Sequence, residues 1–292
     1  MRPRMSTFSI VAYDPAKAEW GVAVQSKFLA VGAAVPWAKA GSGSIATQAW
    51  ANLTYGPQGL KLLEQGLSAD EVVKRLTDAD EGRDHRQLGV VDTRGNAAAY
   101  TGVECLHWAG HLVGRHYCCQ GNILAGPEVG KEMARVFESA QGELADRLLA
   151  ALFAGQEAGG DSRGQESAAL LVVRESGGYG GFSDRLIDLR VDDHERPIAE
   201  LERLLKLHRL YFGETKPEDL LPIEGAIARE LKAILVRSGH SPKGPVDEHY
   251  DEATQGALRK LIGMENLEER FKDEAFIDRV ALEYLRERYS PR

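Results

Sequence analysis

Two residues in the first part of the sequence have the types and spacing needed for nucleophilic catalysis. Thr7 begins a stretch of alternating side chains, and Lys27 follows the next such stretch. A threonine hydroxyl becomes a nucleophile when a nearby base takes its proton. If Thr7 is also the first residue of the mature chain, its own α-amine, with a reference pKa of about 8, can be that base. A nearby lysine ammonium would lower the pKa of the amine further by like-charge repulsion.

A β-hairpin is needed to bring these two residues together. Residues 7–13 and 20–26 are rich in strand-forming residues and are separated by a turn that contains Asp14 and Pro15, which predicts two paired strands. Antiparallel pairing puts the start of the first strand beside the end of the second. We therefore expect the Thr7 hydroxyl to lie near the Lys27 ammonium. The alternative is that Thr7 only opens a strand and Lys27 ends one in solvent.

The nucleophile hypothesis requires removal of residues 1–6. Translation from Met5 and loss of that methionine would expose Ser6, one residue before Thr7. The nucleophile is therefore Ser6, or Thr7 after further trimming, or neither of them.

Further polar side chains fall at predicted strand ends or in the loops beside them. Their amides and hydroxyls could donate to a developing oxyanion or orient a substrate amide, or they could satisfy backbone groups at the strand ends. These candidates are Gln25, Ser26, Gln48, Asn52, Gln120 and Asn122. Asp161 and Arg163 lie in a glycine-rich loop, where the arginine could bind a substrate carboxylate or form a salt bridge that fixes the loop.

Metal-binding patterns are weak. Three histidines and an adjacent cysteine pair fall within residues 107–119, but their spacing fits no standard zinc site. The acidic run at residues 192–195 is typical of the start of a helix. We expect no metal and no cofactor.

Composition narrows the class of protein. The chain has 292 residues, of which 43% are hydrophobic and 27% charged, with a net charge of −8. The negative charge argues against binding to nucleic acid or to an anionic membrane. No apolar run approaches the roughly 20 residues of a spanning helix. Three cysteines and the lack of a signal-peptide core predict a cytoplasmic protein. Whether it forms a homo-oligomer is left open.

The order of predicted elements indicates the fold class. The first hairpin is followed by two predicted helices, one over residues 56–66 and one that begins at a capping box formed by Ser68 and Glu71. Strands over 87–101 and 117–122 come next, then helices over 127–140 and 143–156, strands over 167–173 and 185–191, and a helix from Pro197. Because strands and helices form separate runs, an α+β fold is favoured over a doubly wound parallel sheet. A four-layer αββα sandwich, with helices outside two largely antiparallel sheets, accommodates this order.

The composition changes after Phe212. Residues 213–221 are polar and contain Pro217, which predicts a linker, and residues 222–292 have a helical pattern. We therefore predict a sandwich domain at 1–212 and a small helical domain at 222–292.

Several short motifs lie along the first 212 residues. They are Thr7–Ala12, Gly21–Phe28, Ala46–Ala49, Gln87–Asp92, Gln120–Asn122, Ala125–Pro127, Gly160–Gly164 and Ser167–Ala169. Together they resemble a widespread bacterial family of unknown function that is grouped by fold with N-terminal nucleophile hydrolases. The resemblance covers roughly residues 5–212, and it implies the αββα sandwich and, less directly, hydrolysis.

The C-terminal part resembles a three-helix peptidoglycan-binding module. The matching segments include residues 227–235, 238–240, 244–247 and 265–267. Related modules commonly have glycine after the loop aspartate, and this chain has Glu248 there, so we expect weak or absent binding to intact peptidoglycan.

Two functions of different classes follow from the sequence. The leading hypothesis is an amidohydrolase that acts on a small amide or peptide-like substrate, including peptidoglycan fragments. The alternative is a non-catalytic protein that binds a small ligand or cell-wall fragment. The sequence does not identify the substrate.

Overall fold

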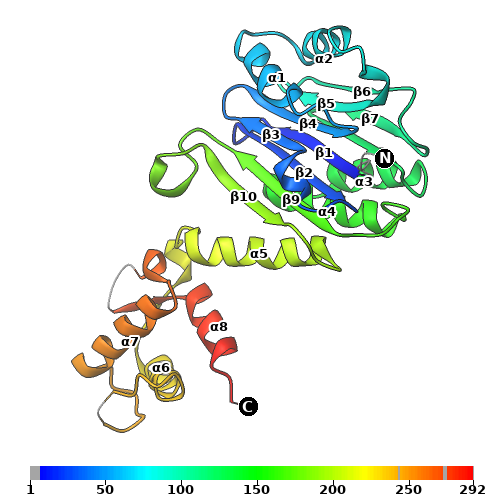
Figure 1. The fold of residues 1–292 in the computed structure, drawn as a ribbon. Helices are drawn as coiled ribbons and strands as arrows, with labels where there is room; N and C mark the ends of the chain where they lie inside the picture. The colour runs from blue at the N-terminus through cyan, green and yellow to red at the C-terminus, as the bar shows by residue number, and fades with distance from the viewer. Residues whose placement is uncertain (1–6, 243, 272–274, 292) are drawn as a thin grey trace. The chain divides into compact units, whose positions relative to one another are not determined.

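The protein is described by a computed structural model over residues 7–242, 244–271 and 275–291. It divides into two compact units, Met1–Leu204 and Leu205–Arg292, and each is described by itself. The first unit is a mixed α/β fold with antiparallel sheets (Figure 1). Among the described residues, no helix has both the length and the apolar character needed to cross a membrane.

The larger sheet of the first unit has six strands, with Thr7 at the start of a central one. Its order is β10-β9-β2-β1-β8-β7, and every neighbouring pair is antiparallel. The strands are β1 (Thr7–Asp14), β2 (Glu19–Ser26), β7 (Gly110–Gly114), β8 (Tyr117–Asn122), β9 (Ser167–Val173) and β10 (Arg185–Val191).

The smaller sheet has four strands in the order β3-β4-β5-β6, again antiparallel. Its strands are β3 (Pro36–Lys39), β4 (Gly43–Ala49), β5 (Arg86–Val91) and β6 (Ala97–Thr101). One face packs on the larger sheet through a shared apolar core. That core includes Val11, Val22, Val24, Ala46, Val91 and Leu171.

Helices cover the outer faces of both sheets (Figure 1). Helices α1 (Tyr55–Glu64) and α2 (Ala69–Asp78) pack on the smaller sheet over a second core that contains Ile45 and Leu88. Ser68 and Glu71 form a capping box that starts α2, as the sequence predicts.

Helices α3 (Glu128–Ser139) and α4 (Leu144–Glu157) lie on the larger sheet. Gly21 of β2 allows α4 to approach closely, because a Cβ at that position would lie 2.6 Å from the Cδ1 atom of Leu148. The same helix passes over Phe8 near its other end, where Phe8 Cε2 would lie 3.2 Å from a Cβ added at Gly155. Helix α4 therefore runs along β1 and β2 toward the end of the sheet that holds Thr7.

The unit boundary falls inside helix α5 (Pro197–Phe212), earlier than the predicted end at Phe212. Leu207, Leu210 and Tyr211 pack into the core of the second unit, which explains the difference. The predicted linker 213–221 also differs, because it includes most of β11 (Leu220–Pro222), which pairs with β12 (Phe276–Asp278). The three predicted helices are α6 (Gly225–Arg237), α7 (Glu252–Met264) and α8 (Arg279–Arg288).

Short 3₁₀ helices complete the described elements: Val31–Ala33, Arg83–His85, Tyr179–Gly181, Pro217–Asp219 and Glu268–Arg270.

Candidate active site

Thr7 lies at the end of the layer between the two sheets. It pairs with Ser26 across the β1–β2 ladder and with Asn122 across the β1–β8 ladder. Directly opposed residues direct their side chains to the same face of a sheet. The Thr7 Oγ1 atom lies 3.2 Å from Ser26 Oγ, and all three residues are buried. The structure thus brings Thr7, Ser26 and Asn122 together, as their predicted strand-end positions suggest.

A buried network of amide side chains continues from this point between the sheets. Gln48 Nε2 donates to Gln87 Oε1 at 2.8 Å, to the Gln120 carbonyl at 3.2 Å and to the Thr7 carbonyl at 3.4 Å. Ser9 Oγ donates to Gln48 Oε1 at 2.5 Å and accepts from Gln120 Nε2 at 2.6 Å. The candidates Gln48 and Gln120 therefore belong to one network with Thr7.

Gln87 is the centre of this network, although it is not among the site residues predicted from the sequence. Its Oε1 atom accepts from Asn122 Nδ2 at 3.1 Å as well as from Gln48. Its Nε2 atom donates to Thr101 Oγ1 at 2.9 Å and to the Gly121 carbonyl at 2.8 Å. Ser9 was missed too. The available signal was the strand period of two, which puts Ser9 on the same face as Thr7.

Gly89 of β5 makes room for one of these amides. A Cβ at Gly89 would lie 2.3 Å from Gln120 Oε1 and 2.9 Å from Cys118 Sγ. Gln120 Oε1 has no hydrogen-bond partner among the described residues. A glycine is therefore required opposite Gln120 for the two sheets to approach at this point.

The prediction that the Lys27 ammonium lies beside Thr7 is wrong. Lys27 Nζ forms an ion pair with Glu166 Oε2 at 3.4 Å and donates to the Gln165 carbonyl at 3.1 Å. The register explains this placement. Ser26 is the residue opposite Thr7, and successive strand residues point to opposite faces, so the next side chain along leaves the Thr7 face. The alternative nucleophile Ser6 lies outside the described residues.

Gln25 and Asn52 also lie away from the Thr7 face. Gln25 pairs with Phe8, whose side chain faces the outer helices, so the Gln25 amide points toward the helices as well. It is fully buried, and neither of its amide atoms has a partner among the described residues. Asn52 instead donates to Asp80 Oδ2 at 3.0 Å and holds the backbone of Thr54 through its Oδ1 atom.

Asp161 acts on the backbone at the end of β2. Its Oδ2 atom accepts from the Lys27 backbone N–H at 3.0 Å, and its Oδ1 atom accepts from the Arg163 N–H at 2.9 Å. The Arg163 guanidinium pairs with the same carboxylate at 3.4 Å. Two roles were predicted for Arg163, binding a substrate carboxylate or forming a salt bridge that fixes the loop. This arrangement corresponds to the second.

A charged cluster lies where β5 begins. Asp80 accepts from Arg86 Nε at 3.0 Å, from Asn52 at 3.0 Å and from the Tyr55 hydroxyl at 2.9 Å. Burial alone would raise the pKa of the Asp80 carboxyl, but hydrogen bonds from Arg86 and Asn52 outweigh it and hold the pKa well below its usual range. Arg86 also lies over the Trp50 ring, 5.7 Å from its centroid.

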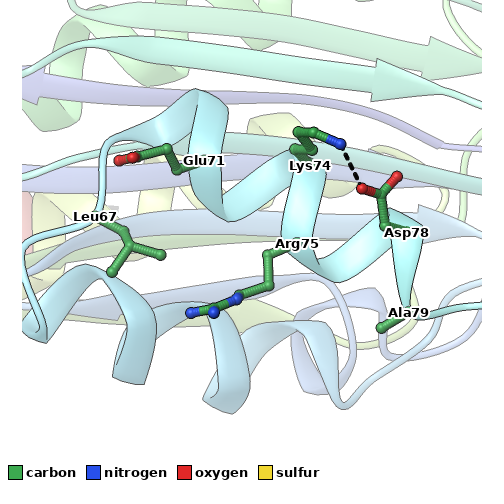
Figure 2. A pocket seen from close by; sticks show the side chains of 6 residues that line it. All are labelled: Leu67, Glu71, Lys74, Arg75, Asp78 and Ala79. Carbon is green, nitrogen blue, oxygen red and sulfur yellow. Dashed lines mark hydrogen bonds and ion pairs between the residues drawn. The ribbon is translucent and has the colours of Figure 1, made fainter.

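A wider groove lies elsewhere on the first unit, on the outer side of α2. Figure 2 shows Glu71, Lys74, Arg75 and Asp78 of that helix along it, with Lys74 paired to Asp78. The groove is open and its charged side chains already pair with one another or face solvent, so it offers no set of reacting groups. Over the described residues, no cluster of His, Cys, Asp and Glu is arranged to hold a metal ion.

Comparison with known proteins identifies the family. The sequence model described as "Family of unknown function (DUF1028)" matches residues 7–201. The chain belongs to this family. A crystal structure of a DUF1028 protein from Silicibacter pomeroyi is 33% identical, with a TM-score of 0.65 over 71% of this chain and 88% of that one. No curated protein sequence matches the chain.

A second solved structure matches the chain only remotely. Anbu, the ancestral β-subunit from Yersinia bercovieri, is 12% identical, with a TM-score of 0.32 over 68% of this chain and 96% of that one. The DUF1028 domain is followed by a match, over residues 211–285, to the family described as "Putative peptidoglycan binding domain".

The loop with the unusual glutamate is well anchored in the second unit. Lys232 is buried and donates to Asp247 Oδ1 at 2.7 Å. Glu248 follows Asp247 and forms an exposed ion pair with Arg229 at 3.0 Å. Glu248 thus adds a carboxylate to the surface of this loop.

Proposed function

We propose that the DUF1028 domain hydrolyses the amide bond of a small, peptide-like molecule, with Thr7 as an N-terminal nucleophile. This proposal rests on one observation. At one end of the layer between the sheets, the Thr7 hydroxyl lies together with the Ser26 hydroxyl and the Asn122 amide. The order of layers, with α1 and α2 on one sheet and α3 and α4 on the other, supports an αββα sandwich of the N-terminal nucleophile hydrolase type.

The reaction would begin after cleavage of the bond between Ser6 and Thr7. The freed α-amine takes the proton of the Thr7 hydroxyl, and Oγ1 forms a bond with the carbonyl carbon of the substrate. The C–N bond breaks as the ammonium returns its proton to the leaving amine. Water then attacks the ester, releases the carboxylic acid and restores the hydroxyl, so that amide and water give acid and amine.

Asn122 and Ser26 are the groups best placed to assist. Both lie directly opposite Thr7 in the sheet, and each carries a polar hydrogen that can be donated to an oxyanion. The Gln87 amide accepts from Asn122 and so orients it. Gln87 is therefore a positioning residue.

A second candidate function is non-catalytic binding of a cell-wall fragment. It is favoured by the peptidoglycan-binding family match at residues 211–285 and by the complete burial of Thr7. In that case Thr7 and its amide neighbours would only hold the two sheets together.

The mass and the N-terminal sequence of the purified protein separate these functions. The hydrolase requires a chain that begins at Thr7, and the binding protein does not.

An activity assay tests the nucleophile directly. Amide hydrolysis, measured by mass spectrometry of the products, should disappear in Thr7→Ala and persist in Thr7→Ser. Loss of the nucleophile removes about 10⁴-fold or more in rate. Circular dichroism should show that both variants are folded. An intact Met1 or Met5 terminus with no hydrolysis would contradict the proposal.

A further inference from the structure

A hydrogen bond joins the edges of the two sheets beside the candidate site. Strand β7 is an outer strand of the larger sheet, and β6 is an outer strand of the smaller one. His111 Nδ1 on β7 lies 2.9 Å from Thr101 Oγ1 on β6. His111 opposes Gln120, whose amide lies between the sheets, so the imidazole is on that same face, although His111 is exposed to solvent. The pair therefore lies where the buried amide network meets solvent.

The connection continues into the amide network through Gln87. Gln87 Nε2 donates to Thr101 Oγ1 at 2.9 Å, and Gln87 Oε1 accepts from Asn122 Nδ2 at 3.1 Å. Asn122 lies directly opposite Thr7 in the β1–β8 ladder. A chain of three hydrogen bonds thus leads from the exposed imidazole to the residue beside the proposed nucleophile.

The direction of the first bond in this chain depends on the charge of the imidazole. A neutral His111 with its proton on Nε2 accepts the Thr101 hydroxyl proton at Nδ1, while Thr101 Oγ1 accepts from Gln87. A protonated ring is a donor at both nitrogens, so Nδ1 then donates to Oγ1 and the hydroxyl proton must turn away. Among the described residues, Thr101 Oγ1 has no third partner to receive that proton. The proton is left unpaired, or it turns toward the Gln87 Nε2 donor and displaces it.

Helix α3 packs against β7 on the face opposite to His111. Leu112, the next residue along β7, is the one that approaches this helix, since its Cδ1 atom would lie 3.8 Å from a Cβ added at Gly130. The charged side chains of α3 have partners of their own: Glu128 with Lys131, Glu132 with Arg135, and Glu138 with the Tyr117 hydroxyl. The charges of α3 therefore do not face the imidazole.

The titratable groups on the neighbouring strands do not charge the space around His111 either. On β8, burial raises the pKa of the Cys118 thiol to about 12, so the thiol stays neutral. On β6, Tyr100 points to the opposite face, toward α2, and the charges of Asp84 and Arg83 act there. Partial burial of the ring lowers the pKa of His111 from its usual value of about 6.5, with no contribution from a charged side chain among the described residues.

We propose that His111 is a pH-sensitive positioning residue, which holds the Gln87 and Asn122 amides in place when it is neutral and releases them when it is protonated. Its effect on catalysis rests on the hydrolase function proposed above, whereas the chain of hydrogen bonds does not. The amide of Asn122 is oriented toward its role at Thr7 near neutral pH, and this orientation is lost as pH falls through the pKa of the imidazole.

Nuclear magnetic resonance of the isotope-labelled full chain tests this connection without any substrate. The side-chain amide signals of Gln87 and Asn122, identified by their loss in Gln87→Glu and Asn122→Asp, should shift with pH at one midpoint below about 6.5. The His111 ring should titrate at the same midpoint. His111→Asn cannot titrate in this range and should abolish both shifts. His116→Asn is the matched control and should leave them unchanged, because His116 bonds the Gly95 carbonyl outside the network.

Variants of Thr101 separate transmission along the chain from a general effect of pH. In Thr101→Val, which keeps the shape without the hydroxyl, the imidazole should still titrate while the Gln87 and Asn122 signals stay constant. Thr101→Ser restores the hydroxyl and should restore both shifts. Amide signals that do not move with His111 in the wild type, or that still move with it in Thr101→Val, would overturn the proposal. The wild-type titration decides this even if a variant fails to fold.

Activity distinguishes failure of this switch from failure of the hydrolase. The ratio of kcat/KM in His111→Asn to kcat/KM in the wild type should rise about 10-fold from well above to well below the His111 midpoint, which is less than the roughly 100-fold or more that loss of an oxyanion donor costs. Titration of the α-amine is common to both proteins and cancels in the ratio. If the amide signals titrate but no amide is hydrolysed at any pH, the hydrolase fails and the switch stands. If hydrolysis occurs with a constant ratio, the hydrolase stands and the switch fails.

Discussion

The layer between the two sheets has an apolar part and a polar end. Around Val11, Val22 and Val24, aliphatic side chains from both sheets fill most of the space. At the Thr7 end, the same strands supply Ser9, Gln48 and Gln87 to an equally buried region. Most polar groups there are paired, because an unpaired buried polar group costs about 1–3 kcal/mol; Gln120 Oε1 has no partner among the described residues.

This difference indicates what the polar end is for. Apolar side chains would hold the sheets together without any need for matched hydrogen bonds, as they do a few residues along the same strands. The hydrogen bonds of the polar end therefore fix the positions of side chains rather than hold the two sheets together. It fixes the orientations of the Asn122 and Gln120 amides next to the Thr7 hydroxyl.

The largest effect on stability is expected at the centre of the polar end. Gln87→Leu should lower the free energy of unfolding by about 3 kcal/mol, because it removes the buried acceptor shared by Gln48 and Asn122 and the donor to the Gly121 carbonyl. Val24→Ala in the apolar part removes only packing and should cost about 2 kcal/mol. Urea denaturation measures both.

Two further results would test this interpretation. Gln87→Glu retains the shape and the acceptor atoms but loses the donor, and it should lie between the wild type and Gln87→Leu. A Gln87→Leu variant as stable as the wild type would mean that the polar network makes no net contribution to folding.

A smaller effect on stability, one that depends on pH, is expected at the charged Asp80 cluster and not at the neutral amides beside it. Hydrogen bonds keep the folded pKa of Asp80 below its unfolded value of about 3.9. Its contribution to stability is therefore present above the unfolded pKa and is lost as pH falls through the lower, folded pKa. The amides do not titrate. Acid denaturation below about pH 4 should be shallower in Asp80→Asn than in the wild type.

Asp78→Asn is the control for this measurement, since Asp78 forms only an exposed pair with Lys74. It should leave the acid slope close to that of the wild type. Equal slopes in the wild type and in Asp80→Asn would contradict the role of the Asp80 cluster.

Much of the fold could be predicted from the sequence, because local patterns specify it. Strand β9 and strand β10 occupy the predicted residues 167–173 and 185–191, and α2 starts at the predicted capping box. In the first unit, strands β3, β4 and β7 were not predicted. Strands β3 and β7 have only 4 and 5 residues, and glycines at both ends of β7 hide its pattern.

The candidate site was predicted less completely, because it depends on register between distant strands. The strand-end positions of Ser26, Gln48 and Asn122 identify them from the sequence. Gln87 is selected only when β5 is known to pair with β4, where it opposes Gln48. Lys27 illustrates the same limit: a shift of one residue in the hairpin register decides which face its side chain takes.

The smallest effect is expected at Lys27, which lies outside the polar end. Its ion pair with Glu166 is exposed, and such pairs contribute no more than about 1 kcal/mol, so Lys27→Ala should scarcely change the free energy of unfolding. If the α-amine of Thr7 acts without Lys27, the pH dependence of kcat/KM should also stay unchanged around the amine pKa of about 8. Lys27→Met, which keeps most of the side-chain length without the charge, should behave in the same way. An upward shift of about 0.5 pH unit or more in both variants would show that the ammonium lowers the pKa of the amine, and would extend the catalytic group beyond the polar end.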